Sequence, residues 1–123
     1  MSAPSLAPYI LKRPWLKRWM LPLANWYVDA AGYRRLGLRH DDLIPEENDT
    51  VQLALKRLPP KEAYDRVFRL RRAFQCSISH QLLPEAERTK PEEDVAYLSP
   101  IIAEIEAENK ERADLDSVAI RRA

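Results

Sequence analysis

The sequence has 123 residues but only two glycines and one cysteine. Two glycines are too few for the glycine-rich loops that hold phosphate in nucleotide-binding proteins. The single cysteine, Cys76, excludes a disulfide within the chain and leaves no second thiolate for zinc or an iron–sulfur cluster. We therefore find none of the usual signatures of a nucleotide, zinc or iron–sulfur enzyme.

Long apolar runs and strand patterns are also missing. The longest uncharged internal run, Trp19 to Val28, has ten residues, whereas a membrane-spanning helix needs about 18 or more. No segment alternates apolar and polar residues with turn residues at both ends, as a half-buried strand would. The sequence thus predicts an all-α protein, a single small domain of about four helices with an extended, partly apolar N-terminal arm and no transmembrane span.

Charge is distributed in blocks along the chain. Residues 1–40 carry seven basic residues and one acidic residue, whereas residues 41–55 carry five acidic residues and no basic one. Blocks of this size indicate segments that face different partners, or each other. Residues 1–28 contain no acid, which is the bias of a mitochondrial targeting region, but arginine and serine are too sparse there for a typical cleaved transit peptide.

Residues 1–31 are predicted to be a basic, tryptophan-rich docking segment. Trp15, Trp19 and Trp26 are spaced by four and seven positions, so a helix would place them on one face. Pro22 would kink or interrupt that helix because it lacks an amide donor. The three tryptophans are candidates for anchoring to a protein or to the membrane–water boundary, and a core role for at least one of them is equally open.

Two helices are predicted in the middle of the chain. A short helix at 50–58 can be capped by Asn48 or Asp49, and a long central helix is predicted at 60–83, between prolines. The long helix has apolar residues at helical intervals, which predict its core-facing side. They are Tyr64, Val67, Phe68, Phe74, Ile78 and Leu82.

The other side of the long helix carries Arg66, Arg69 and Arg72, which could contact phosphate together with the N-terminal bases. Binding of RNA or DNA is therefore an alternative, although the chain lacks glycine-flanked aromatics and its isoelectric point of 7.9 is low for such a protein. A last helix is predicted at 91–116, with a bend near Pro100.

No group of residues predicts catalysis. His40 is followed by Asp41 and Asp42, but one histidine beside acids is more typical of a hydrogen-bonded turn than of a metal site. His80, near the end of the long helix, is interpreted as a packing or capping residue, and Cys76 as a small buried hydrophobe. We expect no bound cofactor and no metal.

Three stretches together resemble a known family: AGYRRLGLRHDDLIPEEN at 31–48, ALKRLPPKEAYDRVFRLRRAFQCSISHQLLP at 54–84, and EEDVAYLSPII at 92–102. They resemble the small 14 kDa subunit of mitochondrial ubiquinol–cytochrome c reductase, respiratory complex III, in its fungal form. The likeness covers about residues 8–115 in order. The first seven residues and the three tryptophans depart from the family pattern.

The resemblance implies an all-helical, non-catalytic subunit, peripheral to the mitochondrial inner membrane on its matrix side and needed for assembly. It would lie against cytochrome b, the large core subunits and other small subunits, with heme b and ubiquinone held by cytochrome b. Cardiolipin is a candidate lipid ligand and nucleic acid is not expected. The candidate docking residues for protein or lipid are Trp15, Trp19, Trp26, Arg34, Arg35, Arg66, Arg69 and Arg72.

The resemblance also implies a role for Glu47. In this family the acidic turn after Asp-Asp-Leu-Ile lies near the matrix entrance to the quinone-reduction site, and the second glutamate of Glu-Glu-Asn is considered part of a proton-uptake route. A carboxylate there could relay protons. The alternative is a solvent-exposed acid before a helix. Two other functions stay open: a free-standing mitochondrial RNA-binding or adaptor protein, and a lipid-surface protein whose basic N-terminal segment binds cardiolipin.

Overall fold

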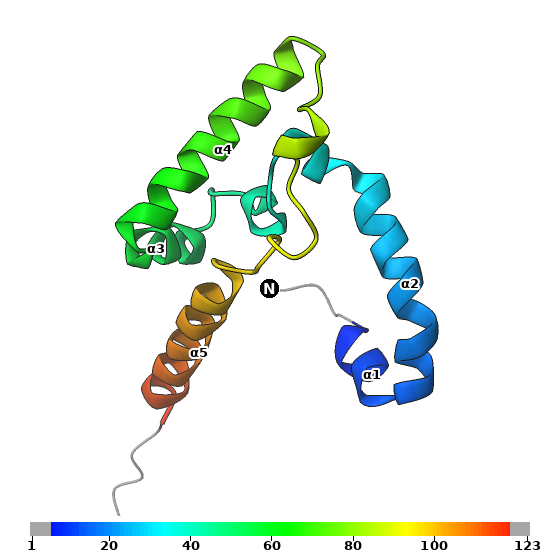
Figure 1. The fold of residues 1–123 in the computed structure, drawn as a ribbon. Coiled ribbons are helices and arrows are strands. Elements are labelled where there is room, and N and C mark those ends of the chain that lie inside the picture. Colours follow the sequence, from blue (N-terminus) through cyan, green and yellow to red (C-terminus); the bar gives the residue numbers. More distant parts are fainter. Residues whose placement is uncertain (1–5, 119–123) are drawn as a thin grey trace, which may run out of the picture. The chain divides into compact units, whose positions relative to one another are not determined.

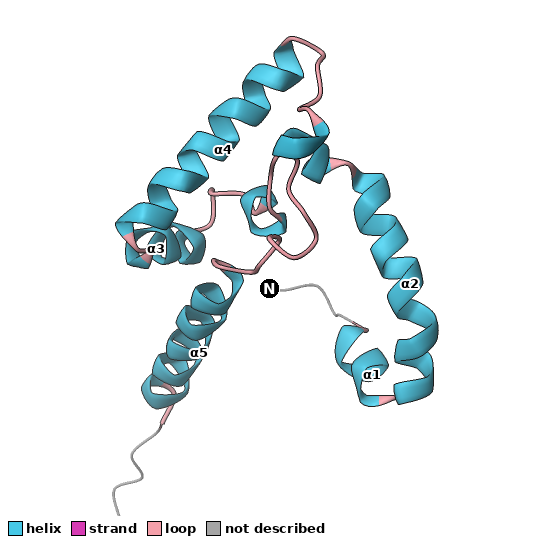
Figure 2. Ribbon diagram, in the orientation of Figure 1, coloured by secondary structure: helices cyan, strands magenta, loops and turns pink. Residues whose placement is uncertain are grey.

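The computed structural model describes residues 6–118 of the chain, and these residues contain helices and no strand (Figures 1 and 2). The predicted all-α class is confirmed. None of the described helices is long and apolar enough to cross a membrane. The chain divides into two compact units, residues 1–33 and 34–123, and each is described below by itself.

The first unit is a pair of helices. Helix α1 (Ala7–Lys12) packs against α2 (Pro14–Ala31), and the two are joined through Arg13. Proline suits the first position of α2 because the amide there has no partner within a helix. Pro22 does not interrupt α2, contrary to one of the two predicted outcomes, and Gly32 ends it in the left-handed conformation (φ 74°) that glycine adopts most readily. No residue of either helix is buried.

The second unit is built around α3 (Asp49–Arg57) and α5 (Ser99–Asp116), which pack against each other. Asn48 caps α3, with its side-chain oxygen 3.1 Å from the Thr50 amide, as one of the two predicted caps would. Three short 3₁₀ helices, η1 (Tyr33–Leu36), η2 (His40–Leu43) and η3 (Glu85–Glu87), lie in the connections. A small cluster of buried apolar side chains forms the core here and consists of Val51, Ala54, Leu58, Leu98 and Ile105.

Helix α4 (Pro60–Ile78) is oriented opposite to the prediction. The five residues of the predicted apolar stripe that lie in α4 are exposed, with Tyr64, Phe68 and Phe74 exposed by 77%, 57% and 68%, whereas Arg66 and Arg69 are exposed by only 3% and 8%. The periodicity identified the apolar face correctly, but it does not show what covers that face. In the folded chain the arginine face is the one that packs inward, and the apolar stripe stays exposed.

Helix α4 also ends earlier than residue 83. It stops at Ile78, and His80 adopts a positive φ of 52°, so the chain turns back before Pro84. A long-range contact favours this turn, because the Leu83 amide donates to the Arg35 carbonyl at 3.2 Å and the Leu83 side chain is buried. The histidine therefore lies in the turn after the helix and not within it.

The C-terminal helix differs from the predicted 91–116 as well. Residues 91–98 form turns and irregular structure, and α5 begins only at Ser99, with Pro100 in its first turn. Pro100 starts the helix there and does not bend its interior, since a missing amide donor costs nothing in the first turn. Asp94, near the start of the predicted helix, makes a tertiary contact instead: it accepts from the His40 amide at 2.8 Å.

Candidate functional site: the acidic turn and the arginine face of α4

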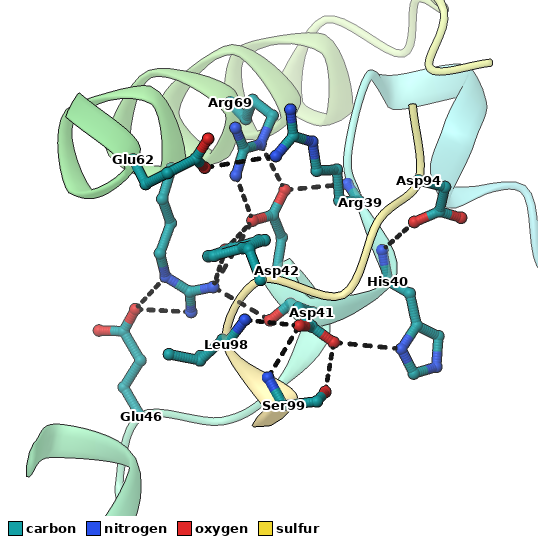
Figure 3. Close-up of polar contacts among 12 residues, drawn as sticks. Arg39, His40, Asp41, Asp42, Glu46, Glu62, Arg69, Asp94, Leu98 and Ser99 are labelled. Carbon is teal, nitrogen blue, oxygen red and sulfur yellow. Dashed lines mark hydrogen bonds and ion pairs between the residues drawn. The ribbon is translucent and has the colours of Figure 1, made fainter. Parts of the chain in front are cut away.

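The two aspartates of η2 lie inside the second unit. Asp41 and Asp42 are exposed by 1% and 4%, although a turn of this composition is usually solvated. Figure 3 shows them pointing to opposite sides of the turn, one toward the start of α5 and the other toward α4. Burying a carboxylate costs free energy unless it is hydrogen-bonded or ion-paired. The groups that donate to Asp41 and Asp42 therefore stabilise the folded chain.

Asp41 caps helix α5 from 57 residues away in the sequence. Its carboxylate accepts from the Leu98 amide at 2.7 Å, the Ser99 amide at 2.9 Å and the Ser99 hydroxyl at 2.5 Å. Leu98, the N-cap residue, provides no side-chain cap of its own. Burial alone would raise the pKa of Asp41, but the hydrogen bonds from Ser99 and Leu98 outweigh it, and the pKa lies below its ordinary value of 3.8.

Asp42 joins α4 to the turn. It accepts a bidentate pair from Arg69, with Nε at 2.7 Å and Nη2 at 2.9 Å, and it also accepts from the Arg39 amide at 2.9 Å and from the Tyr97 hydroxyl (Figure 3). Burial raises the pKa of this carboxyl, whereas Arg69 and Tyr97 lower it, and the net pKa lies below 3.8. For Tyr97, burial and the adjacent carboxylate raise the pKa of the phenol above 10.0.

Arg66 connects this pair of aspartates to the acidic loop that follows. Its Nη2 lies 2.9 Å from Glu46 Oε1, and its Nη1 donates to the Asp41 carbonyl at 3.1 Å and the Tyr97 hydroxyl at 2.8 Å. Burial would lower the pKa of Arg66 and of Arg69, but the hydrogen-bonding partners of each arginine raise its pKa above the ordinary value. Residues 39–46, the inner face of α4 and the start of α5 therefore form one polar network, which is buried at Asp41, Asp42, Arg66 and Arg69 and reaches the surface at Glu46.

This network corrects the placement of two predicted docking residues. Arg66 and Arg69 were expected on an outer basic face, but their charges are neutralised inside the chain because the acidic turn lies against that side of α4. Arg72 is partly buried, with Nη2 3.5 Å from the Gly37 carbonyl. Its Nε is buried and has no hydrogen-bond partner among the described residues.

The other docking candidates occupy different settings. Arg34 forms an ion pair with Asp94 at 2.9 Å, and Arg35 is exposed. The tryptophans at positions 15, 19 and 26 of the first unit are all more than half exposed. Contacts of these residues with a partner stay predictions.

Glu47 differs sharply from its neighbour. Both glutamates are exposed, but Glu47 makes no hydrogen bond or ion pair to any residue that the structure describes, whereas Glu46 is held by Arg66. The arrangement leaves one carboxylate of the Glu46–Glu47 pair available to water or to a partner, immediately before the Asn48 cap of α3.

The remaining candidates give no catalytic geometry within residues 6–118. No group of three metal-binding side chains occurs there. The His40 ring is mostly exposed, with Nδ1 3.7 Å from Asp41 Oδ1, and Cys76 is partly buried in α4. The charged groups of the buried network form ion pairs and hydrogen bonds with one another. This arrangement is typical of a structural network and not of a reactive site.

Asp42, Tyr97 and Ser99 were not predicted as site residues. The alternation of charge blocks, which allowed acidic and basic segments to face each other, could have pointed to Asp42, whereas Tyr97 and Ser99 are uncharged and carry no such signal. In the structure, the acidic segment and the basic segment do face each other: Arg66 and Arg69 both form ion pairs with Asp42.

Comparison with known proteins assigns the chain to a family. The family model "Ubiquinol-cytochrome C reductase complex 14kD subunit" matches residues 14–113. The chain belongs to this family. It is 58% identical over 120 residues to cytochrome b-c1 complex subunit 7 of Neurospora crassa, covering 98% of each chain. Its identity to the mitochondrial subunit 7 of Saccharomyces cerevisiae is 47% over 119 residues, covering 97% of this chain and 94% of that one. Its identity to subunit 7 of Pongo abelii is 43% over 97 residues, covering 79% and 86%.

Membership confirms the resemblance seen in the sequence. The chain is a subunit of mitochondrial ubiquinol–cytochrome c reductase, works in respiratory electron transport and is associated with the inner membrane. It is not itself the catalyst of the complex, whose cofactors belong to other subunits. We therefore interpret the buried network as an element that stabilises the fold of this subunit.

Proposed function

We propose that the chain is a peripheral, matrix-side subunit that braces cytochrome b near its quinone-reduction site, contacts the large core subunits and other small subunits, and is needed for assembly of the reductase. The observation that carries the proposal is the exposed apolar face of α4. Tyr64, Val67, Phe68, Phe74 and Ile78 are between 45% and 77% exposed along one side of this helix. Apolar patches of this kind mark surfaces that a partner covers.

The inner network explains how such a face is held in place. Arg66 and Arg69 fix α4 to the acidic turn by charge-assisted hydrogen bonds, so the helix keeps its orientation without burying its apolar side. The same arrangement weakens the alternative of a free-standing RNA-binding protein, because two of the three arginines of the basic stripe are already paired within the chain.

The docking proposal is tested by charge substitution on α4. Phe74→Asp should lower the amount of assembled reductase, because it places a carboxylate in a desolvated contact. Ser77→Asp is the matched control, since it adds the same charge three residues away at an exposed position outside the apolar stripe. Assembled complex is quantified by native electrophoresis and by the b-type heme in mitochondria that carry each variant. Equal assembly of the two variants would contradict the proposal.

We further propose that Glu47 takes part in proton uptake during quinone reduction. Reduction of a quinone consumes protons from the matrix side, and a carboxylate at the entrance can transfer them. The structural support is the contrast between two exposed glutamates of the acidic loop: Arg66 holds Glu46, whereas Glu47 makes no contact of this kind with the described residues.

The adjacent glutamates provide a matched experiment. Glu47→Gln should slow quinol–cytochrome c reductase turnover and change its pH dependence while leaving assembly intact. Glu46→Gln makes the same chemical change one residue earlier and should retain the rate and pH profile of the unmodified complex. An assembled Glu47→Gln complex with unchanged rate and pH profile would exclude the proton-uptake role without touching the bracing role.

A further inference from the structure

Helix α4 carries four arginines, and only two of them are neutralised within the part of the chain that the structure describes. Arg66 and Arg69 form ion pairs of 2.9 Å and 2.7 Å with carboxylates of the acidic segment 41–46 (Figure 3). Arg71 and Arg72 form no ion pair with any described residue. The acidic turn therefore balances the inner side of α4 and leaves two cations of the helix without a counter-charge.

Arg71 lies in the middle of the exposed apolar stripe. At about 100° per residue, its direction from the helix axis is within about 60° of that of every apolar residue of the stripe. The positions three and four residues away on either side, which are its neighbours on the helix surface, carry no charge. They are Val67, Phe68, Phe74 and Gln75. Arg71 is exposed and makes no hydrogen bond to any described residue, so the stripe has a cation at its centre and no anion beside it.

Arg72 adds a second cation at the edge of the stripe. Its guanidinium carbon lies 5.4 Å from the centroid of the Phe68 ring, and its Nε is buried without a hydrogen-bond partner among the described residues. The nearest acidic residue along α4, Asp65, precedes Arg71 by six positions and lies on a different side of the helix. The local charge of the stripe is therefore positive.

A partner that covers the stripe takes Arg71 out of water. Burying a charge without a counter-charge costs much free energy, whereas a carboxylate can accept two parallel hydrogen bonds from one guanidinium. The stripe is the convex side of a single helix, which fits the surface grooves of another helix, while small apolar ligands occupy concave sites. The surface that complements α4 is thus that of a protein, apolar around one carboxylate.

We propose that the partner subunit that covers α4 presents an aspartate or glutamate to Arg71, within an otherwise apolar contact. This contact rests on the proposed docking of α4 and adds the chemistry of the partner surface. The carboxylate fixes the register of the two surfaces, because an apolar stripe alone allows sliding along the helix axis and a buried ion pair does not.

The first test measures how fast the tagged chain dissociates from purified, assembled reductase. Arg71→Met keeps most of the side-chain length and should raise the dissociation rate by about thirtyfold or more, because the partner carboxylate is left buried without a cation. Lys110→Met also removes a charge, at an exposed position of α5, and should change the rate by less than about twofold. An Arg71→Met chain that dissociates no faster than Lys110→Met would overturn the proposal, since methionine suits a purely apolar contact.

The second test locates the carboxylate itself. Arg71→Lys keeps the positive charge and provides a primary amine, which a carbodiimide joins to a contacting carboxylate as an amide. Mass spectrometry of the treated complex should find position 71 linked to an aspartate or glutamate of another subunit. Ser77→Lys places the same amine at an exposed position of α4 outside the stripe and should give no such link. An assembled Arg71→Lys complex without this link would overturn the carboxylate contact and leave Arg71 to a lipid phosphate or to water.

The Phe74→Asp variant distinguishes failure of this contact from failure of the docking proposal. Unchanged assembly of Phe74→Asp would remove the docking of α4 and the carboxylate contact together. Reduced assembly of Phe74→Asp, with Arg71→Met dissociating no faster than Lys110→Met, would remove the carboxylate contact alone.

Discussion

Neutralising Asp42 is the perturbation with the largest expected effect on the folded chain. The Arg69 guanidinium, whose side chain is 10% exposed, donates to both oxygens of a carboxylate that is fully buried. Asp42→Asn keeps the side-chain volume but leaves the Arg69 charge without its partner. Breaking a buried ion pair from one side costs about 3–5 kcal/mol. That is a large share of the roughly 5–15 kcal/mol that stabilises an ordinary domain.

The measurement is a urea titration of the full-length chain followed by circular dichroism at the helix band. With a urea dependence of about 1–3 kcal/mol per molar, the midpoint should fall by about 1 M or more. Glu47→Gln is the control, because it is the same kind of substitution at an exposed residue without a partner among those described, and its effect should stay within about 0.5 kcal/mol.

A double variant separates the cost of an unpaired charge from general damage to packing. In Asp42→Asn with Arg69→Met, the unpaired guanidinium is gone, so the free energy of unfolding should recover part of the loss seen for Asp42→Asn alone. The reasoning is refuted if Asp42→Asn is no less stable than the Glu47→Gln control, or if the double variant loses the sum of two independent costs.

Three further perturbations test the same unit. Asp41→Ala removes the cap of α5 and should cost about 2 kcal/mol, seen as faster amide exchange in the first turn of that helix; unchanged exchange would contradict the capping role. Gly37→Ala should cost about 2–4 kcal/mol in urea titrations, because its added carbon would lie 2.3 Å from Arg72 Nη2 at a φ of +73°. Gly32→Ala meets no close atom and should lose only about 1–2 kcal/mol, so equal losses would exclude the clash. Because the pKa values of Asp41 and Asp42 lie below 3.8 in the folded chain, their contribution to the free energy of unfolding is present above that pH and is lost as the pH falls below it. The free energy of unfolding of Asp42→Asn should therefore decline less steeply with falling pH than that of the unmodified chain. An identical decline in the two proteins would count against the lowered pKa of Asp42.

Local features of the fold could be read from the sequence. The Asn48 cap and the proline at the start of α4 depend on neighbouring residues alone, so the starts of α3 and α4 follow from their own segments. The absence of strand patterns was likewise a property of each segment in turn. These are the predictions that need no knowledge of which segments meet.

The features that sequence reasoning misplaced all depend on distant contacts. The start of α5 at Ser99 is set by Asp41, 58 residues earlier, and the early end of α4 accompanies the bond from the Leu83 amide to the Arg35 carbonyl. Periodicity likewise marked the two faces of α4 without showing that its arginines face inward. A buried arginine is the rarer outcome, and only the position of the acidic turn makes it favourable.

Within the candidate site, Glu47 was identified through the family resemblance and not by the geometry of the chain. What the structure adds is the difference between Glu47 and Glu46, which share a sequence context but not a partner. The roles of the network residues could not have been predicted singly, because each carboxylate depends on donors that are distant in the sequence: Asp42 on Arg69 and Tyr97, and Asp41 on Leu98 and Ser99.

The most direct test of the central claim is recovery of the tagged full-length chain from mitochondria in mild detergent, with reduced-minus-oxidised spectra taken of the material that accompanies it. A subunit held by buried apolar contacts should bring b-type heme with it and keep that heme through a high-salt wash, whereas polyanion binding weakens steeply with salt. Retention of b-type heme at high salt is the result that the account predicts. Recovery of the chain without b-type heme would contradict it.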